Sequence, residues 1–522
     1  MKIARFFTVF VPISTVWLMA GCGDSCTEVW PTFNGSAKYV SSACGSSGGD
    51  GSQAAPYATP AEAAKVAKAG DTIVLAGGGY SGGFTLPGGV NLLGPGAGKA
   101  TLSAGGGTGI TIAGNGKTTI RGVAVNGAAG YGIASTGVAL VLSDVTVSGT
   151  KPDKNGAGGH GVQAEGGAEL VLEAAKIQGN VGTGVLAVGV AMVSIVDPAF
   201  KPGASDGGTA IVDPAFAPAS VISGNEGGGV AIVDPAFAPG SNDAPKLPVQ
   251  IAATDISKNK NFGLALFGGG ASIVRSAIRD TQKTATGDFA DGVVVASSAK
   301  TKAGALVVDA QSAVTGNGRA GLVAATQAQV SVEGELSGNE TGGAWVQGAG
   351  AVLQLGPKAR LRKNGLLGAG ANKGGRIEVN GARIEATQAR KFAEPAGGMP
   401  EDVGDGLGAF NGSSLQVKGA RIANNARAGV IAHAPKVGGA LTGIEIDVTG
   451  SEFEGGQFGI VINKTGLAKL PDAVGLKGDN KFSAVKKDVD NAGNLMVRSS
   501  VCSDQQKDPE ACSPKQATPA GK

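Results

Sequence analysis

The sequence predicts an all-β fold in which short strands stack into one long solenoid. Composition and two regular signals support this prediction. Of the 522 residues, 91 are glycine, 42% are hydrophobic and only 4% are aromatic. The aliphatic side chains need a buried core, whereas the glycines indicate many turns. Because no strict Gly-X-Y period is present, a collagen triple helix is excluded.

The first signal is a glycine followed by a small apolar strand, which recurs at steps of about 21–30 residues. This step suits one solenoid coil made of three short strands. Two longer steps, Gly229 to Gly263 and Gly368 to Gly406, fit coils that carry an inserted loop. The recurring glycines are Gly83, Gly109, Gly132, Gly161, Gly184, Gly208, Gly229, Gly263, Gly292, Gly321, Gly343, Gly368, Gly406, Gly429 and Gly459.

The second signal is a turn residue that stands four positions before many of these glycines. Asn and Asp tolerate left-handed backbone and form hydrogen bonds with the main chain in turns. Stacked coil on coil, they predict a ladder of side-chain amides along one edge of the solenoid. The residues are Asn180, Asn225, Asn259, Asn317, Asn339, Asn364 and Asn425, with Asp288 and Asp402 at the same offset in two further coils.

The ordered region begins with a helix signal. Thr59 and Glu62 form a capping box with Pro60 at the first helical position, which predicts a short helix over 60–68 that is closed by Gly70. A β run, 71–76, follows. This passage, 56–80, resembles the N-terminal cap and first coil of bacterial proteins of the pectin-lyase-like superfamily. The resemblance implies a single right-handed parallel β-helix solenoid with a short N-terminal capping helix, which we expect over 56–495.

The first 21 residues have the features of a secretory signal, with Lys2 and Arg5 before an apolar stretch. Residues 18–22, Leu-Met-Ala-Gly-Cys, resemble the lipobox of bacterial lipoproteins. The resemblance implies cleavage before Cys22 and a diacylglycerol on its sulfur, and Gly23 after it favours the outer membrane. The alternative is an ordinary signal peptide with an incidental cysteine. Residues 22–55 are rich in Gly and Ser and predict a flexible tether.

Four cysteines remain besides Cys22, and each pair is local. Cys26 with Cys44 and Cys502 with Cys512 are plausible disulfides in an oxidising compartment. Zinc is the less favoured alternative, because the spacings are unlike those of ligand sets and no histidine is near. The second pair lies in a polar tail, 496–522.

One phrase, Ile-Val-Asp-Pro-Ala-Phe, occurs three times, beginning at Ile195, Ile211 and Ile232. A duplicated strand followed by an Asp-Pro turn explains it best. The second and third copies are one coil apart, so their carboxylates, with the first, offer a calcium site as the alternative.

Residues with possible chemistry are few, and none forms a catalytic set. Gly159-His160-Gly161 resembles a fragment of the polygalacturonase signature, but the Asp and Arg motifs of that family are missing, so we interpret His160 as a loop residue. Trp345 is interpreted as edge packing. We predict no metal and no cofactor.

Arginines offer the best candidate for a groove that binds anionic sugars. Arg275 and Arg279 followed by Asp280 form one set, and Arg360 and Arg362 with Lys363 form another. Arginines on adjacent coils can hold carboxylates with paired hydrogen bonds. Solvated strand faces would carry the same residues.

The favoured function is a non-catalytic, lipid-anchored β-helix of the bacterial cell envelope. It would bind a polysaccharide or another envelope protein, with the membrane as a partner through the lipid. A net charge of only +3 offers no broad basic surface for nucleic acid. The alternative is a lyase, hydrolase or epimerase acting on uronic-acid polymers, with its site in the inserted loops at Gly229–Gly263 or Gly368–Gly406.

Overall fold

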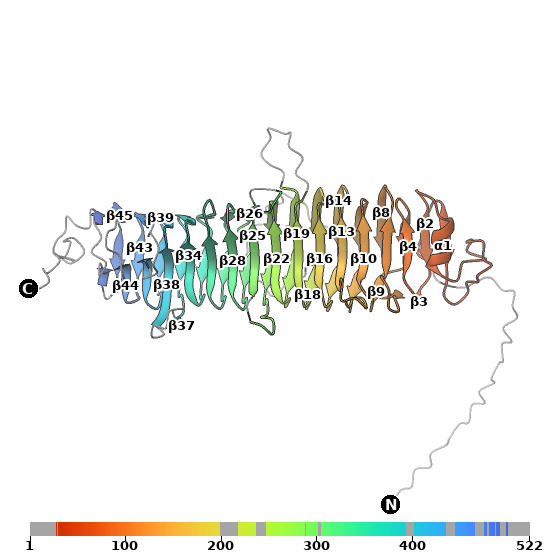
Figure 1. Cartoon of the computed structure of the whole chain (residues 1–522), viewed down its shortest axis with the longest axis horizontal. Helices are drawn as coiled ribbons and strands as arrows, with labels where there is room; N and C mark the ends of the chain where they lie inside the picture. Colours follow the sequence, from red (N-terminus) through yellow and green to blue (C-terminus); the bar gives the residue numbers. More distant parts are fainter. Residues whose placement is uncertain are drawn as a thin grey trace, which may run out of the picture.

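The chain forms a straight rod of stacked coils (Figure 1). The computed structural model describes residues 28, 30–198, 218–235, 247–287, 289–300, 304–392, 401–434, 444–464, 474–477, 480–485, 487–490 and 497–499. Over these ranges, three sheets of 17, 15 and 16 strands, here called A, B and C, run along the rod. Each coil contributes one strand to each sheet in the order A, B, C, and stacked strands pair in parallel. The predicted parallel β-helix is therefore confirmed.

Sheet A holds the strands β1 Ala37–Val40, β2 Thr72–Leu75, β5 Asn91–Leu93, β8 Lys117–Arg121, β11 Ala139–Ser143, β14 Glu169–Glu173, β17 Met192–Val196, β20 Val249–Ala252, β23 Gly269–Val274, β26 Gly304–Val308, β29 Gln329–Val332, β32 Val352–Leu355, β35 Arg376–Asn380, β39 Ser414–Lys418, β42 Glu445–Thr449, β45 Val474–Lys477 and β48 Val497–Ser499.

Sheet B holds the strands β3 Gly78–Ser81, β6 Ala100–Ser103, β9 Ala124–Asn126, β12 Thr146–Ser148, β15 Lys176–Gln178, β18 Ser220–Ser223, β21 Thr254–Ser257, β24 Ala277–Arg279, β27 Ala313–Thr315, β30 Glu335–Ser337, β33 Arg360–Arg362, β36 Arg383–Glu385, β40 Arg421–Ala423, β43 Glu452–Glu454 and β46 Lys481–Ser483.

Sheet C holds the strands β4 Phe84–Pro87, β7 Ile110–Ala113, β10 Tyr131–Thr136, β13 His160–Glu165, β16 Thr183–Val188, β19 Gly228–Val233, β22 Asn261–Phe267, β25 Ala290–Ala296, β28 Ala320–Ala325, β31 Gly342–Gln347, β34 Leu366–Asn372, β38 Glu401–Phe410, β41 Ala428–Ala434, β44 Phe458–Lys464 and β47 Lys487–Asp490, and the short β37 Arg390–Phe392 pairs antiparallel with β38.

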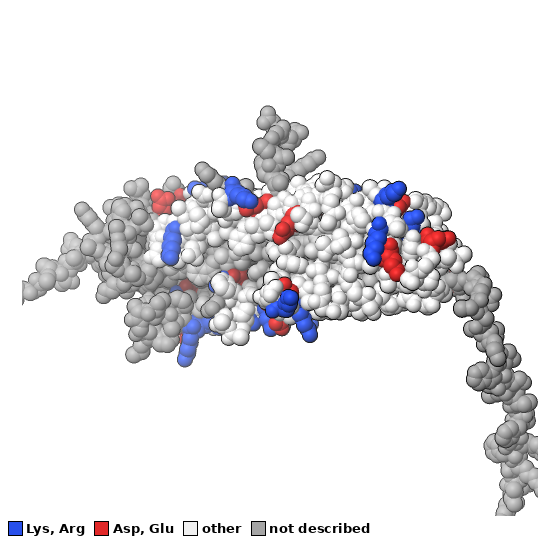
Figure 2. All heavy atoms as spheres, turned by 45° about the vertical axis from the view of Figure 1, so that its right-hand side comes forward, with Lys and Arg blue, Asp and Glu red and all other residues white. Residues whose placement is uncertain are grey.

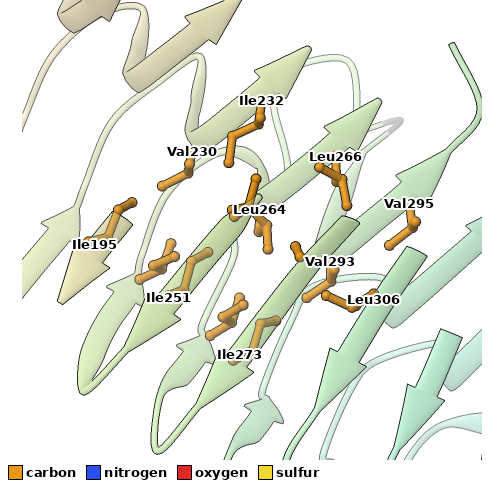
Figure 3. Packing of buried hydrophobic residues seen from close by; sticks show 14 of the residues in the cluster. Ile195, Val230, Ile232, Ile251, Leu264, Leu266, Ile273, Val293, Val295 and Leu306 are labelled. Carbon is orange, nitrogen blue, oxygen red and sulfur yellow. The ribbon is translucent and has the colours of Figure 1, made fainter. Parts of the chain in front are cut away.

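The core is a continuous aliphatic column enclosed by the three sheets. Successive side chains of a strand point to opposite faces, so Leu140 and Leu142 of β11 are buried, while Val141 between them is partly exposed. Figure 3 shows how Ile251 of sheet A and Leu264 of sheet C point into the same interior. The alternation leaves every second side chain of each coil available to the outer surface.

The predicted asparagine ladder is confirmed at the corner between sheets B and C. All seven asparagines are buried. Asn317 donates from its backbone N–H and from Nδ2 to Oδ1 of Asn339, at 3.1 and 2.8 Å, and Asn339 donates in the same way to Asn364. Asn339 therefore satisfies buried donors of the preceding coil and donates to the next, whereas Asn364 donates from Nδ2 to the carbonyl oxygen of Leu336.

Threonine takes the ladder position in three coils. The backbone N–H groups of Thr150, Thr281 and Thr387 donate to the side chains of Asn180, Asn317 and Asn425 at 3.0–3.1 Å. Within the described residues, the hydroxyl groups of these threonines are buried without a hydrogen-bond partner. A hydroxyl is too short to continue the amide-to-amide bonds, so the ladder is interrupted at these coils.

The assignment of Asp402 to the ladder was wrong, and Asp288 lies outside the described residues. Thr387 holds the ladder position in the coil of Asp402. The chain then forms β37 and β38 outside the corner. In this antiparallel pair of strands, Asp402 is in register with Lys391. These extra residues, which project from the lower side of the rod in Figure 1, separate the ladder position from the next glycine. In this coil, a residue four positions before the recurring glycine consequently does not occupy the ladder position.

The recurring glycine lies beside the ladder, which explains why the two signals share one register. A Cβ at Gly321 would lie 2.5 Å from Nδ2 of Asn339 and 2.7 Å from the carbonyl oxygen of Gly343. Gly343 has the same relation to Asn364 and to the carbonyl oxygen of Gly368. Any larger residue would push the coils apart or displace the amide.

The capping helix is confirmed, although it is shorter than predicted. Helix α1 covers Pro60–Val66, with both hydrogen bonds of the Thr59–Glu62 capping box, and packs against β1, β2 and β4. The helix ends at Val66 because Ala67 is extended, and the carboxylate of Asp71 accepts the N–H of Lys68 at 2.9 Å. The helix covers the open end of the core in Figure 1.

The predicted flexible tether, 22–55, was wrong for its second half. Strand β1 pairs with β2 over its whole length, and Val40 is fully buried. The backbone of Tyr39 forms hydrogen bonds with Gly51 and Tyr57, which ties the loop after β1 to the first coil. The β-helix therefore begins at Ala37, and its last described strand, β48, extends beyond the expected end at residue 495.

Replacing Asn339 by alanine should lower the free energy of unfolding by about 3 kcal/mol, because the buried N–H of Asn317 loses its acceptor. Gln354→Ala, which removes an exposed amide from the outer face of β32, is the control and should change stability by less than about 0.5 kcal/mol. Urea unfolding measures both. Equal stability of the two variants would contradict a structural role for the ladder.

Candidate functional site

The structure places the first predicted arginine set at two different corners. Arg279 ends β24 on the outer face of sheet B, with Asp280 next to it, whereas Arg275 follows β23 at the corner between sheets A and B. Arg279 donates from Nε and Nη2 to the two carboxylate oxygens of Asp255, both at 3.0 Å, and from Nη1 to Asp280 at 3.2 Å. Burial opposes the charged form of Arg279, but the hydrogen bonds and the charge of Asp255 raise its pKa.

Paired arginine–carboxylate bonds recur at three more places. Arg362 binds Glu335 at 2.9 and 3.0 Å. Arg319 binds Asp291, and Arg427 binds Asp405, through both carboxylate oxygens.

These pairs neutralise acids that the fold buries. Asp291 and Asp405 are fully buried, and each also accepts a backbone N–H, from Ala320 and Ala428 respectively, at 3.1 Å. Such carboxylates have no free lone pair directed at solvent, and breaking the pair would leave a buried charge. We therefore interpret them as structural pairs rather than as acid or base groups.

The second predicted arginine set lies together at β33. Arg360 and Arg362 point outward from the two ends of this strand, and exposed Lys363 follows at the corner. Arg362 is bound to Glu335, whereas for the side chain of Arg360 no hydrogen bond or ion pair is recorded among the described residues.

Two copies of the repeated phrase end at different corners. Asp197 follows β17 of sheet A, whereas Asp234 follows β19 of sheet C and accepts a hydrogen bond from Ser298. These two carboxylates therefore do not line one edge. The copy at Ile211 lies outside the described residues, and over the described part of the chain no group of three metal-binding side chains occurs.

His160 is the first residue of β13, so its interpretation as a loop residue was wrong. Its ring stacks on Tyr131, with centroids 6.1 Å apart, and its Nδ1 accepts the N–H of Thr183 at 3.0 Å. The imidazole thus joins three neighbouring coils and serves packing.

Trp345 lies in the middle of β31 between β28 and β34, which corrects its interpretation as edge packing. It is in register with Gly370, which is in register with Gly408. A Cβ at Gly370 would lie 3.0 Å from the indole ring, and a Cβ at Gly408 would lie 2.6 Å from the ring of Phe410. Both rings therefore lie close against the glycine backbone, with centroids 6.1 Å apart.

We call Trp345, Gly370, Gly408 and Phe410 the aromatic shelf. Both rings are partly exposed on the outer face of sheet C. Two amides, Gln347 and Asn372, stand beside the rings on the same face, in register with one another. Among the described residues, Oδ1 of Asn372 accepts from Asn411 at 3.0 Å, and no partner is recorded for its Nδ2 or for the Gln347 amide.

This arrangement was missed by sequence reasoning because Gly370, Gly408 and Phe410 are unremarkable residues in so glycine-rich a chain. Aligning the coils on their recurring glycines would have found it, since Trp345, Gly370 and Gly408 all stand two positions after one. Chemically, flat apolar rings with neighbouring amides suit a ligand that combines an apolar face with hydroxyl groups.

Charged side chains are few on the face of the rod in Figure 2, where most of them form small groups of both signs. Within the described residues, no helix is long and apolar enough to cross a membrane. Cys22, Cys26, Cys502 and Cys512 lie outside these residues, and Cys44 is exposed in the loop after β1. The lipid anchor and both disulfides thus stay predictions.

Several solved structures match this chain at low sequence identity and low TM-score. The mannuronan C-5 epimerase AlgE6 A-module of Azotobacter vinelandii is 13% identical, with a TM-score of 0.32 and coverage of 84% of this chain and 92% of that one. A GH87 α-1,3-glucanase catalytic domain is 10% identical, with a TM-score of 0.33 and coverage of 82% and 64%. Pectate lyase Pel9A is 13% identical, with a TM-score of 0.23 and coverage of 88% and 78%.

No protein-family model matches the sequence, and a comparison with curated proteins finds no match either. At these TM-scores the solved structures give no basis for assigning an activity. The fold therefore stands on the strand pairing of this chain, and its function must be argued from its own surface.

Burial lowers the pKa of His160 below its ordinary value of 6.5. The unfolded chain consequently binds the proton more tightly, so the stability contributed by neutral His160 is complete above about pH 6.5 and is lost as the pH falls toward the lowered pKa. His160→Gln should therefore lose less thermal stability than the parent between about pH 8 and pH 5. Equal losses of Tm in the two proteins would exclude this role.

Proposed function

We propose that the protein is a non-catalytic scaffold of the bacterial cell envelope that binds polysaccharide on the outer face of its β-helix. The observation that carries the proposal is the aromatic shelf. Trp345 and Phe410 present partly exposed rings on a rigid sheet, and Gln347 and Asn372 place amides beside them. A sugar ring offers an apolar face to the aromatic rings and hydroxyl groups to the amides.

The rigidity of the sheet supports binding. Each shelf residue sits on a strand that is hydrogen-bonded to neighbours on both sides, so little conformational entropy remains to be lost when a ligand binds. Stacked strands are spaced by about 4.8 Å, so a linear polymer lying along the rod would meet equivalent positions repeatedly.

A non-catalytic role is supported by the state of the buried acids. Asp255, Asp291, Glu335 and Asp405 are each held by an arginine through two hydrogen bonds. General acid or base catalysis needs a carboxyl group that can exchange a proton with substrate. These four acids are instead occupied by structural pairs.

One feature favours an enzyme as the second candidate. Glu378 and Asp447 lie two strands apart on the outer face of sheet A, with Gln416 between them. Two strand spacings, about 9.6 Å, are near the upper end of the separation of catalytic carboxyls in inverting glycosidases. Glu378, however, is bound to Arg376 at 2.8 Å and to Gln354 at 3.0 Å.

Truncating Trp345 to alanine should weaken binding to immobilised polysaccharides roughly 30-fold, the loss expected for a buried aromatic anchor of about 2 kcal/mol. A glycan array identifies the polymers, and titration gives the affinities. Val294→Ala, at the equivalent outward position two coils away, is the control and should bind as the parent does. If no glycan binds the parent protein, or if Trp345→Ala binds equally well, the shelf is not a sugar site. Turnover of a bound polymer that is lost in Glu378→Gln would establish the enzyme instead.

The lipid anchor gives a separate prediction. Changing Cys22 to serine removes the only atom that can accept the diacylglycerol, so the variant should lose labelling by a fatty-acid analogue and should leave the membrane fraction. Labelling is followed by gel fluorescence after metabolic incorporation, with Cys26→Ser as the matched control. A labelled Cys22→Ser protein would contradict lipidation at this position.

A further inference from the structure

Three arginines stand directly above one another on the outer face of sheet B. Arg360 of β33 is in register with Arg383 of β36, which is in register with Arg421 of β40. We call these three residues the arginine column. All three side chains are exposed, and their Cα atoms are separated by one strand spacing, about 4.8 Å.

Acids flank the column on the same face, since Glu335 is in register with Arg360 at one end and Glu452 is in register with Arg421 at the other. On the next two coils, Glu452 is in register with Lys481 and binds it at 3.5 Å. Arg421 itself binds Glu454 at 2.7 Å and approaches Glu385 at 3.9 Å.

Arg360 and Arg383 differ from Arg421 in their contacts. Over the described ranges, no side-chain hydrogen bond or ion pair is recorded for either guanidinium group. Like charges directly opposite one another in a sheet destabilise it. The column therefore contains two adjacent cations for which no ion pair occurs among the described residues, because Glu335, in register with Arg360, is bound to Arg362 instead.

We infer that the arginine column binds the acidic groups of an anionic polysaccharide laid along the rod. Guanidinium groups hold carboxylate or sulfate oxygens with two parallel hydrogen bonds. The strand spacing is close to the length of one sugar in an extended chain, so successive acidic sugars can meet successive arginines. Each contact at an exposed site is weak, and the linked contacts of a polymer provide the affinity.

The arginine column adds a second binding site to the proposed function and specifies that the polysaccharide is anionic. The column lies on sheet B, whereas the aromatic shelf lies on sheet C, so each can fail without the other. A nucleic acid is the weaker choice, because the net charge is only +3 and the first coils of the rod carry neutral residues at the same outward position, Thr101, Ala124 and Thr146, before Lys176.

The test compares the full-length parent with the double variant Arg360→Ser/Arg383→Ser. The matched control is Arg121→Ser/Lys176→Ser, which removes the same charge from exposed positions in the N-terminal half of the rod. The probes are polygalacturonate, a sulfated galactan, a neutral β-glucan, galacturonate monomer and vesicles containing phosphatidylglycerol. Affinities are measured by biolayer interferometry at two salt concentrations.

The parent should bind polygalacturonate or the sulfated galactan more tightly than the monomer, and the arginine variant should lose at least roughly tenfold in affinity with a smaller salt dependence. The control variant should lose less than about twofold. Trp345→Ala should retain its salt-sensitive binding to the acidic polymer.

Three results would overturn the inference. In the first, the parent binds neither acidic polymer. In the second, the arginine variant binds both polymers as tightly as the control variant does. In the third, the parent binds only the vesicles. In each of these cases, binding of the neutral glucan that depends on Trp345 would leave the proposed function intact.

Discussion

The structure depends on the contact between the asparagine ladder and the recurring glycines at the corner between sheets B and C. Asn317 and Asn339 each donate from Nδ2 to the asparagine of the next coil, whereas Asn364, which a threonine follows, donates from Nδ2 to the carbonyl oxygen of Leu336. This bonding is possible only where the neighbouring strand has no side chain, because a Cβ at Gly321 would touch the amide of Asn339. In the coils that carry it, the same contact aligns each coil with the next at this corner.

A fixed register turns single outward positions into continuous columns of side chains. Trp345 is in register with Gly370, and Arg360 is in register with Arg383, because the corner between sheets B and C keeps successive coils aligned. The two surfaces use this alignment differently. On sheet C the absence of side chains gives two aromatic rings a flat base, whereas on sheet B Arg360 and Arg383 form no ion pair with the described residues. A rigid solenoid can carry both on neighbouring faces.

Departures from the register occur where residues have been inserted. The coil that contains Thr387 leaves the corner to form β37 and the start of β38, and there the ladder has a hydroxyl in place of an amide. Thr150 and Thr281 mark two further interruptions. The acids that become buried, such as Asp405 beside this insertion, are held by arginines, which keeps local charge balanced. The ladder and the core thus supply stability along the rod, whereas insertions at single corners vary its surface.

The sequence by itself determined the coil repeat, the glycine and asparagine positions and the capping box of Thr59, because each depends on local backbone geometry that recurs at a constant spacing. Tertiary structure alone decided which side chains meet across coils, since that depends on how many residues each corner contains. Asp402 was assigned to the ladder because its offset was right, yet the inserted strand moved it away. The burial of Val40 likewise depends on pairing with a strand more than thirty residues later, which local composition does not encode.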